Sequence, residues 1–146
     1  MEVCTANFGT ISATDRDIIR FPEGLAGLED CHNWLILADS LDAELLWLQS
    51  ADRAEIALPV VSPTRFVPQY RVRVDADELT SLAIDRDRDV QVLVTVNHID
   101  SLPTINLKAP LVINLSGRVG RQVVVPEAWS IRHLIAGTPG SLRRTA

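Results

Sequence analysis

Short apolar runs alternate with turn-forming residues along this chain, and this punctuation limits the possible fold more than any other feature. The strongest run, residues 90–96, reads VQVLVTV and is dominated by β-branched residues. Runs of this length, bounded by Gly, Pro, Asn or Asp, are typical of β-strands. We predict strands at residues 3–11, 17–21, 33–38, 44–49, 56–61, 70–74, 90–96, 110–115 and 121–125.

A single segment has the pattern of a helix. Asp75 is a suitable N-cap, Glu78 follows three residues later as in a capping box, and Leu79 and Leu82 share one face. The other connections are too short for the crossovers that parallel strands need. We therefore predict an all-β, mainly antiparallel, small barrel-like or folded-sheet domain with one short helix near residues 76–83.

At 146 residues the chain has the length of one domain. We expect residues 1–135 to form the β domain and residues 136–146, which are small, polar and basic, to form a flexible tail. No apolar run approaches the roughly 18 residues of a membrane helix. The first ten residues also lack the basic and apolar regions of a secretory signal. The expected location is the cytoplasm, without a membrane partner.

Charge is distributed unevenly along the sequence. Residues 1–100 carry 18 acidic and 8 basic side chains, whereas residues 101–146 carry 1 acidic and 6 basic side chains. An acidic chain is a poor general binder of nucleic acid, because phosphates must be neutralised by clustered Lys and Arg. The charge pattern suits a basic protein partner.

The residue types of catalytic and metal sites are present but lie in unsuitable contexts. Cys4 and Cys31 form no CxxC pair, and their spacing from histidine fits no common zinc site. No histidine lies in a nucleophile or HExxH motif. Residues 117–120 have the GxxG form of an RNA-binding loop, but strand-like flanks favour a hairpin turn. We expect no enzyme activity, no metal and no cofactor. The histidines are His32, His98 and His133.

A glycine-rich loop at residues 21–30 is the first candidate for partner binding. Pro22 ends the hydrogen bonding of the preceding strand, and two glycines permit backbone conformations that are closed to other residues. Leu25 and Leu28 are apolar residues within this loop. They either pack inward or contact a partner.

A second candidate loop, residues 61–70, places Phe66 between two prolines. An aromatic residue in such a loop either fills space in the core or contacts a partner.

In the stretch 104–125 we expect paired strands with a turn at residues 116–120. There Asn106 bonds to neighbouring backbone and Pro110 marks a strand edge. The candidate partner-binding residues are Phe21, Pro22, Glu23, Gly24, Leu25, Leu28, Phe66, Asn106 and Pro110.

Five short motifs follow one another along the chain. They are Phe8-Gly9; Phe21-Pro22-Glu23-Gly24 with Gly27 and Glu29; Trp47-Leu48-Gln49-Ser50; Asn106-Leu107 with Ala109-Pro110 and Ile113-Asn114; and Arg121-Gln122-Val123. In this order they resemble the FliW family of flagellar assembly factors. The resemblance extends from about Cys4 to His133, which is nearly the whole chain. The basic tail is not part of the family pattern.

The resemblance implies a cytoplasmic bacterial regulator with a β-barrel-like fold and no catalytic activity. It implies two protein partners: the carbon storage regulator, a small RNA-binding dimer that represses translation of flagellin mRNA, and flagellin itself. The two partners would exchange in a switch that relieves repression without direct binding of nucleic acid. The alternative is a small β-barrel that binds a sugar or nucleotide, or an enzyme with a site in the barrel mouth.

Overall fold

The computed structural model describes residues 1–73, 75, 77, 80, 82, 90–99 and 101–135. One short 3₁₀ helix, η1, spans Pro63–Arg65. Among these residues no helix is long and apolar enough to cross a membrane. The strands are β1 (Glu2–Thr5), β2 (Gly9–Ser12), β3 (Ile19–Arg20), β4 (Asn33–Ala38), β5 (Leu46–Ser50), β6 (Ala57–Val61), β7 (Val90–Ile99), β8 (Leu102–Ile105), β9 (Leu111–Asn114), β10 (Val119–Gln122) and β11 (His133–Leu134).

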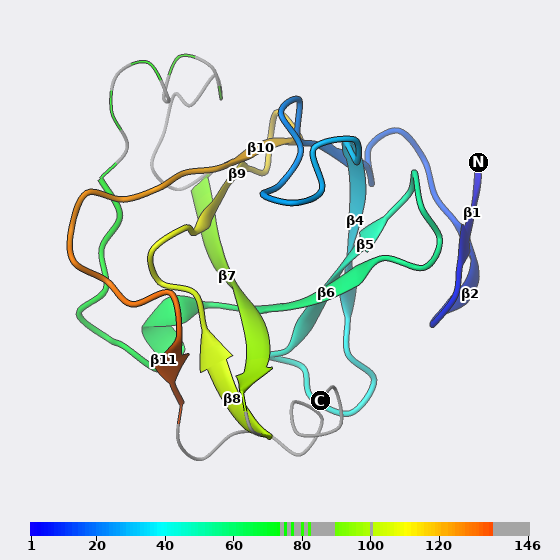
Figure 1. The fold of residues 1–146 in the computed structure, drawn as a ribbon. Helices are drawn as coiled ribbons and strands as arrows, with labels where there is room; N and C mark the ends of the chain where they lie inside the picture. Colours follow the sequence, from blue (N-terminus) through cyan, green and yellow to red (C-terminus); the bar gives the residue numbers. More distant parts are fainter. Residues whose placement is uncertain are drawn as a thin grey trace.

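Seven of these strands form a closed ring in the order β7-β6-β5-β4-β3-β10-β9, with β9 pairing back onto β7 (Figure 1). Every neighbouring pair is antiparallel except β3 and β10, which are parallel. Strands β8 and β11 extend the sheet from one end of β7. The prediction of an all-β, mainly antiparallel, barrel-like domain is confirmed. Closure hides the unpaired backbone groups of the sheet edges.

The interior of the barrel is filled by side chains from six strands and from the loop that follows β3. Trp34 and Phe21 are the largest of these side chains and are fully buried. Strand side chains alternate between faces, so β4, β5, β6 and β9 each direct two apolar residues inward at positions two apart. The buried cluster comprises Ile19, Phe21, Leu25, Cys31, Trp34, Leu48, Val60, Leu93, Leu111 and Ile113.

The stretch 106–110 interrupts one edge of β7. Strands β8 and β9 pair with successive parts of β7, and residues 106–110 lie opposite only residues 94 and 95. This bulge is held by the Asn106 side chain, whose Oδ1 accepts hydrogen bonds from the backbone N–H groups of Lys108 and Ala109 at 3.0 and 3.1 Å. Asn106 therefore has the expected structural role in shaping backbone.

Three predicted strands differ from the observed ones, and two observed strands are absent from the prediction. The strand predicted at residues 121–125 is β10, Val119–Gln122, because the turn predicted at residues 116–120 ends at residue 118. Residues 3–11 form a hairpin, β1–β2, rather than one strand. Gly9 adopts φ of 71° there, and the Thr5 hydroxyl donates to the Gly9 carbonyl. Residues 71–73 form no strand, and Val74 lies outside the described residues. Strands β8 and β11 were not predicted.

The predicted helix near residues 76–83 and the predicted tail at 136–146 lie largely or wholly outside the described residues. Within the helix segment, Asp77, Thr80 and Leu82 are described and have helical backbone. Leu82 is buried against Val112, and its carbonyl accepts a 2.8 Å hydrogen bond from Asn114 Nδ2.

Candidate partner-binding surface

The glycine-rich loop, residues 21–30, lies across one end of the barrel beside β4 and β10 (Figure 1). It is anchored by Phe21, whose side chain is fully buried and whose N–H donates to the His32 carbonyl at 2.7 Å. The Phe21 ring packs directly on Gly120 of β10, where an added Cβ would lie 2.5 Å from the ring. The loop therefore closes this end of the barrel.

The loop folds back on itself as a miniature hairpin. Leu25 and Leu28 exchange backbone hydrogen bonds of 3.3 and 2.8 Å, and Gly27 at the tip has φ of 81°. Gly24 has φ of 67°, and a Cβ there would lie 2.6 Å from backbone atoms of Leu28 and Glu29. Only glycine fits this close approach at residue 24, whereas at residue 27 the positive φ alone favours glycine.

The loop encloses a shallow groove of about 260 Å³ together with the end of β10, the residues that follow β10, and Ala109 before β9. We call this the loop groove. Its floor is held by Gln122, which accepts a 2.8 Å hydrogen bond from the Ala26 N–H and donates a 3.0 Å bond to the Ala109 carbonyl. Arg121 lies 3.1 Å from Glu23 in an ion pair across it. The lining residues are Glu23, Gly24, Leu25, Ala26, Glu29, Ala109, Arg121, Gln122 and Val124.

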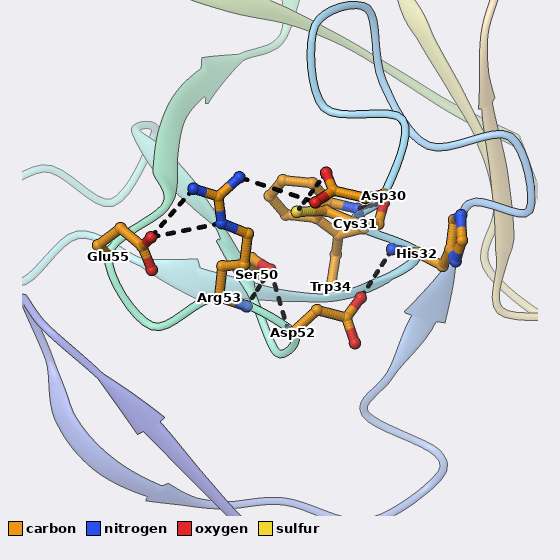
Figure 2. A network of polar contacts seen from close by, with 8 residues as sticks. All are labelled: Asp30, Cys31, His32, Trp34, Ser50, Asp52, Arg53 and Glu55. Atoms are coloured by element: carbon orange, nitrogen blue, oxygen red, sulfur yellow. Dashed lines mark hydrogen bonds and ion pairs between the residues drawn. The ribbon is translucent and has the colours of Figure 1, made fainter.

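A polar network ties the end of the loop to the turn between β5 and β6 (Figure 2). The Arg53 guanidinium lies between Asp30, at 3.8 Å, and Glu55, at 3.2 Å. Asp52 Oδ2 accepts from the N–H groups of His32 and Asn33 at 2.7 and 2.9 Å. The ion pairs are exposed and contribute little on their own, so the backbone hydrogen bonds of Asp52 provide the main restraint.

The Cys31 thiol within this network is a poor nucleophile. Cys31 is fully buried, and its pKa is raised because burial disfavours the thiolate. A reactive cysteine needs a lowered pKa and access to solvent. The described residues hold no group of three or more His, Cys, Asp or Glu side chains placed to bind a metal ion.

Several of the predicted residues line the loop groove, and others belong to the loop without lining the groove. Glu23 and Pro22 are exposed, and Leu28 is half-buried. Phe21, Gly24 and Leu25 are buried, with Leu25 only 4% exposed. Of the two alternatives for Leu25, inward packing is therefore observed. Contact with a partner stays a prediction.

The remaining predicted residues lie elsewhere. Phe66 is half-buried against a second core cluster, with the Arg65 guanidinium 5.2 Å from its ring centroid. Asn106 shapes the bulge, and Pro110 is buried at its end. None of the three lines the loop groove.

Sequence reasoning missed two residues that the groove exposes or depends on. Val124 is 74% exposed although it is apolar, and Gln122 holds the loop tip. The signal for Gln122 was present, because Arg121-Gln122-Val123 is one of the motifs on which the resemblance rests. Nothing local could reveal that Gln122 reaches Ala26, which lies 96 residues earlier.

Comparison with known proteins agrees with this architecture. The family described as FliW protein matches residues 2–135. The Flagellar assembly factor FliW of Thermoanaerobacter pseudethanolicus is 36% identical over 139 residues, which cover 92% of this chain and 93% of that protein. The protein of the same name from Bdellovibrio bacteriovorus is 36% identical, covering 87% and 74% of the two chains. A crystal structure of the flagellar assembly factor FliW superposes with a TM-score of 0.84 at 28% identity, covering 92% of this chain and 96% of that one. The chain thus belongs to the FliW family of flagellar assembly factors.

Proposed function

We propose that this protein acts in the cytoplasm as a non-catalytic regulator of flagellar assembly. It binds the carbon storage regulator and flagellin in exchange for one another, so that binding relieves repression of flagellin translation without contact with the mRNA. Family membership over residues 2–135 is the observation that carries the role in flagellar assembly. The two partners are those that the sequence resemblance implies.

The acidic outer face of the glycine-rich loop supports a basic partner. Glu23, Glu29 and Asp30 are exposed, and the loop groove beside them ends at the exposed apolar Val124. An apolar contact surrounded by charge is the usual anatomy of a protein interface. We assign the basic regulator to this face.

The alternative, a small-molecule site in the barrel mouth, receives less support. At the end closed by the loop, Phe21 and Leu25 are packed with Trp34 in the buried cluster. A ligand site needs a concave cavity with a few convergent polar groups. Apolar side chains occupy that position here.

Titration of the full chain with the purified regulator dimer and with purified flagellin, followed by calorimetry, tests the partner assignment. Each partner should bind, and addition of flagellin to the complex with the regulator should release the regulator. If neither binds, the partner assignment is wrong. If both bind at once, the exchange is wrong.

Substitution of Val124 tests the surface. Val124→Arg places a positive charge in the groove without disturbing buried residues, and we expect at least tenfold weaker binding of the regulator. Leu41→Arg is the matched control, because Leu41 is a similarly exposed apolar residue (67%) that does not line the groove. Equal binding by the two variants would show that the regulator binds at another surface, without contradicting the choice of partners.

A further inference from the structure

Three arginines from separate segments line a depression of about 710 Å³ beside the parallel seam between β3 and β10. Arg16 lies in the turn before β3, Arg20 is in β3, and Arg118 is in the turn between β9 and β10. The seam has a single residue pair, Val119 with Arg20. We call this the arginine depression. The loop groove described above has no residue in common with it.

Arg118 is held in place before any ligand arrives. Its backbone has φ of 53°, a conformation that a residue with a side chain adopts only when its surroundings impose it. Its Nη2 donates a 2.9 Å hydrogen bond to the Asp17 carbonyl. Its Nε is buried and has no hydrogen-bond partner among the described residues. A buried donor without a partner is unfavourable, so a ligand oxygen that reached it would be stabilised.

The carboxylates that face the depression do not neutralise its arginines. Asp52 accepts hydrogen bonds from the N–H of His32 and from the N–H and side-chain amide of Asn33. Burial opposes its ionisation, but these hydrogen bonds outweigh burial and lower the pKa of Asp52. The carboxylate oxygens of Asp52 are therefore bound to His32 and Asn33 and not to an arginine. Asp17, which is next to Arg16 but does not line the depression, accepts from the backbone and side chain of Thr14.

Within the part of the chain that the structure describes, none of the three arginines lies within ion-pair distance of a carboxylate. The remaining acidic lining residue, Asp15, is exposed. Three guanidinium groups therefore face two carboxylates, Asp15 and Asp52, in the lining of a depression on a chain whose net charge is −5. Such a local reversal of charge attracts an anionic group.

The wall of the depression is partly apolar. Ile18 and Ala51 line it and are half-buried against the cluster formed by Val3, Ala13 and Leu35. A ligand that fits both features carries carboxylates close to an apolar side chain. Guanidinium groups bind carboxylates in a planar, bidentate manner, which makes arginine the suitable residue for this pairing.

We propose that the arginine depression binds an acidic peptide segment, with carboxylates next to an apolar side chain, from a protein partner. A nucleic acid is disfavoured. A continuous phosphate backbone needs an extended track of basic residues, and here the exposed acidic residues Asp15 and Asp17 flank Arg16. A short acidic peptide meets the three arginines without passing over the acidic surface of the rest of the chain.

Fluorescence anisotropy with the full chain tests this proposal. The probe is a fluorescein-labelled peptide in which Glu and Leu alternate, and the comparison probe carries Gln in place of every Glu. We expect saturable binding of the Glu peptide, at least tenfold weaker binding of the Gln peptide, and at least tenfold weaker binding of the Glu peptide by the Arg16→Gln, Arg20→Gln double variant. Arg73→Gln with Arg132→Gln is the charge-matched control, because both arginines are exposed outside the depression, and it should bind like the parent protein.

The competing outcomes each decide the matter. Equal loss of binding in both double variants would show a general charge effect and overturn the site. Displacement of the peptide by a single-stranded RNA oligonucleotide at lower concentration than by unlabelled peptide would assign the depression to nucleic acid instead. Binding of inorganic phosphate alone, without the peptide, would reduce it to a simple anion site. Thermal unfolding of both double variants at the parent temperature confirms that the comparison concerns folded protein.

Discussion

Gly120 shows how one position without a side chain permits the closure of the barrel. The Phe21 ring occupies the space that a Cβ would take, and the ring is fully buried, so it has no room to retreat. We expect Gly120→Ala to lower the free energy of unfolding by about 1–3 kcal/mol, the usual range for overpacking a core. Urea denaturation measures the change. In a Phe21→Leu background the same substitution should cost clearly less, and an undiminished cost would show that the clash is not with Phe21.

Tyr70 is the one tyrosine in the chain, so its ionisation can be followed directly by ultraviolet absorbance. Its hydroxyl donates a 2.6 Å hydrogen bond to the Leu107 carbonyl, and burial raises its pKa to about 12. Below pH 10, the ordinary value, neither the folded nor the unfolded state is ionised and the protein has its full stability. Between pH 10 and 12 the unfolded state loses its proton first, so stability falls by about 1.4 kcal/mol per pH unit.

The Tyr70→Phe variant separates this titration from other alkaline effects. It should lose about 1–2 kcal/mol at neutral pH, because the Leu107 carbonyl is left without its side-chain donor. Its stability should then decline less steeply than that of the parent protein between pH 10 and 12. Parallel declines in the two proteins, or a phenol that titrates near 10 in the folded state, would contradict the burial argument.

At the same scale, the sequence indicates the role of a residue where the cause is local. Asn106 is predicted to bond to neighbouring backbone, and it does so two and three residues away. The inward packing of Leu25 could not be decided in advance, because it depends on residues of strands far along the chain. Local chemistry is readable from the sequence, whereas burial depends on which distant elements meet.

Among the elements, the glycine-rich loop combines a packed inner side with an exposed outer side. Leu25 belongs to the inner side and is 4% exposed. Leu25→Ala should therefore lower the free energy of unfolding by about 2–5 kcal/mol, as for other truncations in a core. Leu41→Ala, at a position that is 67% exposed, should change it by less than about 0.5 kcal/mol. Thermal unfolding measures both.

Partner binding by the folded fraction of the Leu25→Ala variant separates support from contact. If Leu25 only supports the loop, that fraction binds normally once the unfolded population is taken into account. If binding falls while the midpoint of unfolding stays in place, Leu25 contacts the partner despite its burial. In that case Leu25 contributes more to partner binding than the exposed residues Pro22 and Glu23.

Strand positions follow from the sequence to different degrees. The run 33–38 coincides with β4, because both ends carry clear signals and the segment is strongly apolar. The sequence predicts one strand at residues 3–11 because Gly9 alone is a weak turn signal, and the observed turn depends on the Thr5 hydroxyl. Strand β11 is two residues long and is defined only by its pairing with β8. So short a strand has no periodicity to detect.

For the whole molecule, the sequence predicts the fold class but not how the ring closes. Closure depends on two contacts between distant segments, the pairing of β7 with β9 and the parallel pairing of Arg20 with Val119. The second contact lies outside the rule that short connections give antiparallel neighbours, because it joins segments that are about a hundred residues apart, and so it could not be predicted from local connections. The loop groove and the arginine depression both lie where segments far apart in the sequence meet. The sequence therefore indicates the glycine-rich loop side of the groove but not the residues opposite it, and it indicates no residue of the arginine depression as a binding candidate.

The charge of the whole chain leads to a prediction about rates, which depends on the proposed basic partner. The net charge is −5, and 18 of the 19 acidic residues precede residue 101. Long-range attraction guides a basic dimer toward an acidic surface before any specific contact forms, and salt screens it over about 10 Å at 0.1 M. Raising the ionic strength should therefore lower the association rate constant severalfold while changing the dissociation rate constant much less.

Stopped-flow mixing of this protein with the basic regulator at several salt concentrations measures both constants. An association rate constant that stays flat across the series would rule out electrostatic steering. A dissociation rate constant that carries most of the salt effect would place the charges within the bound interface instead.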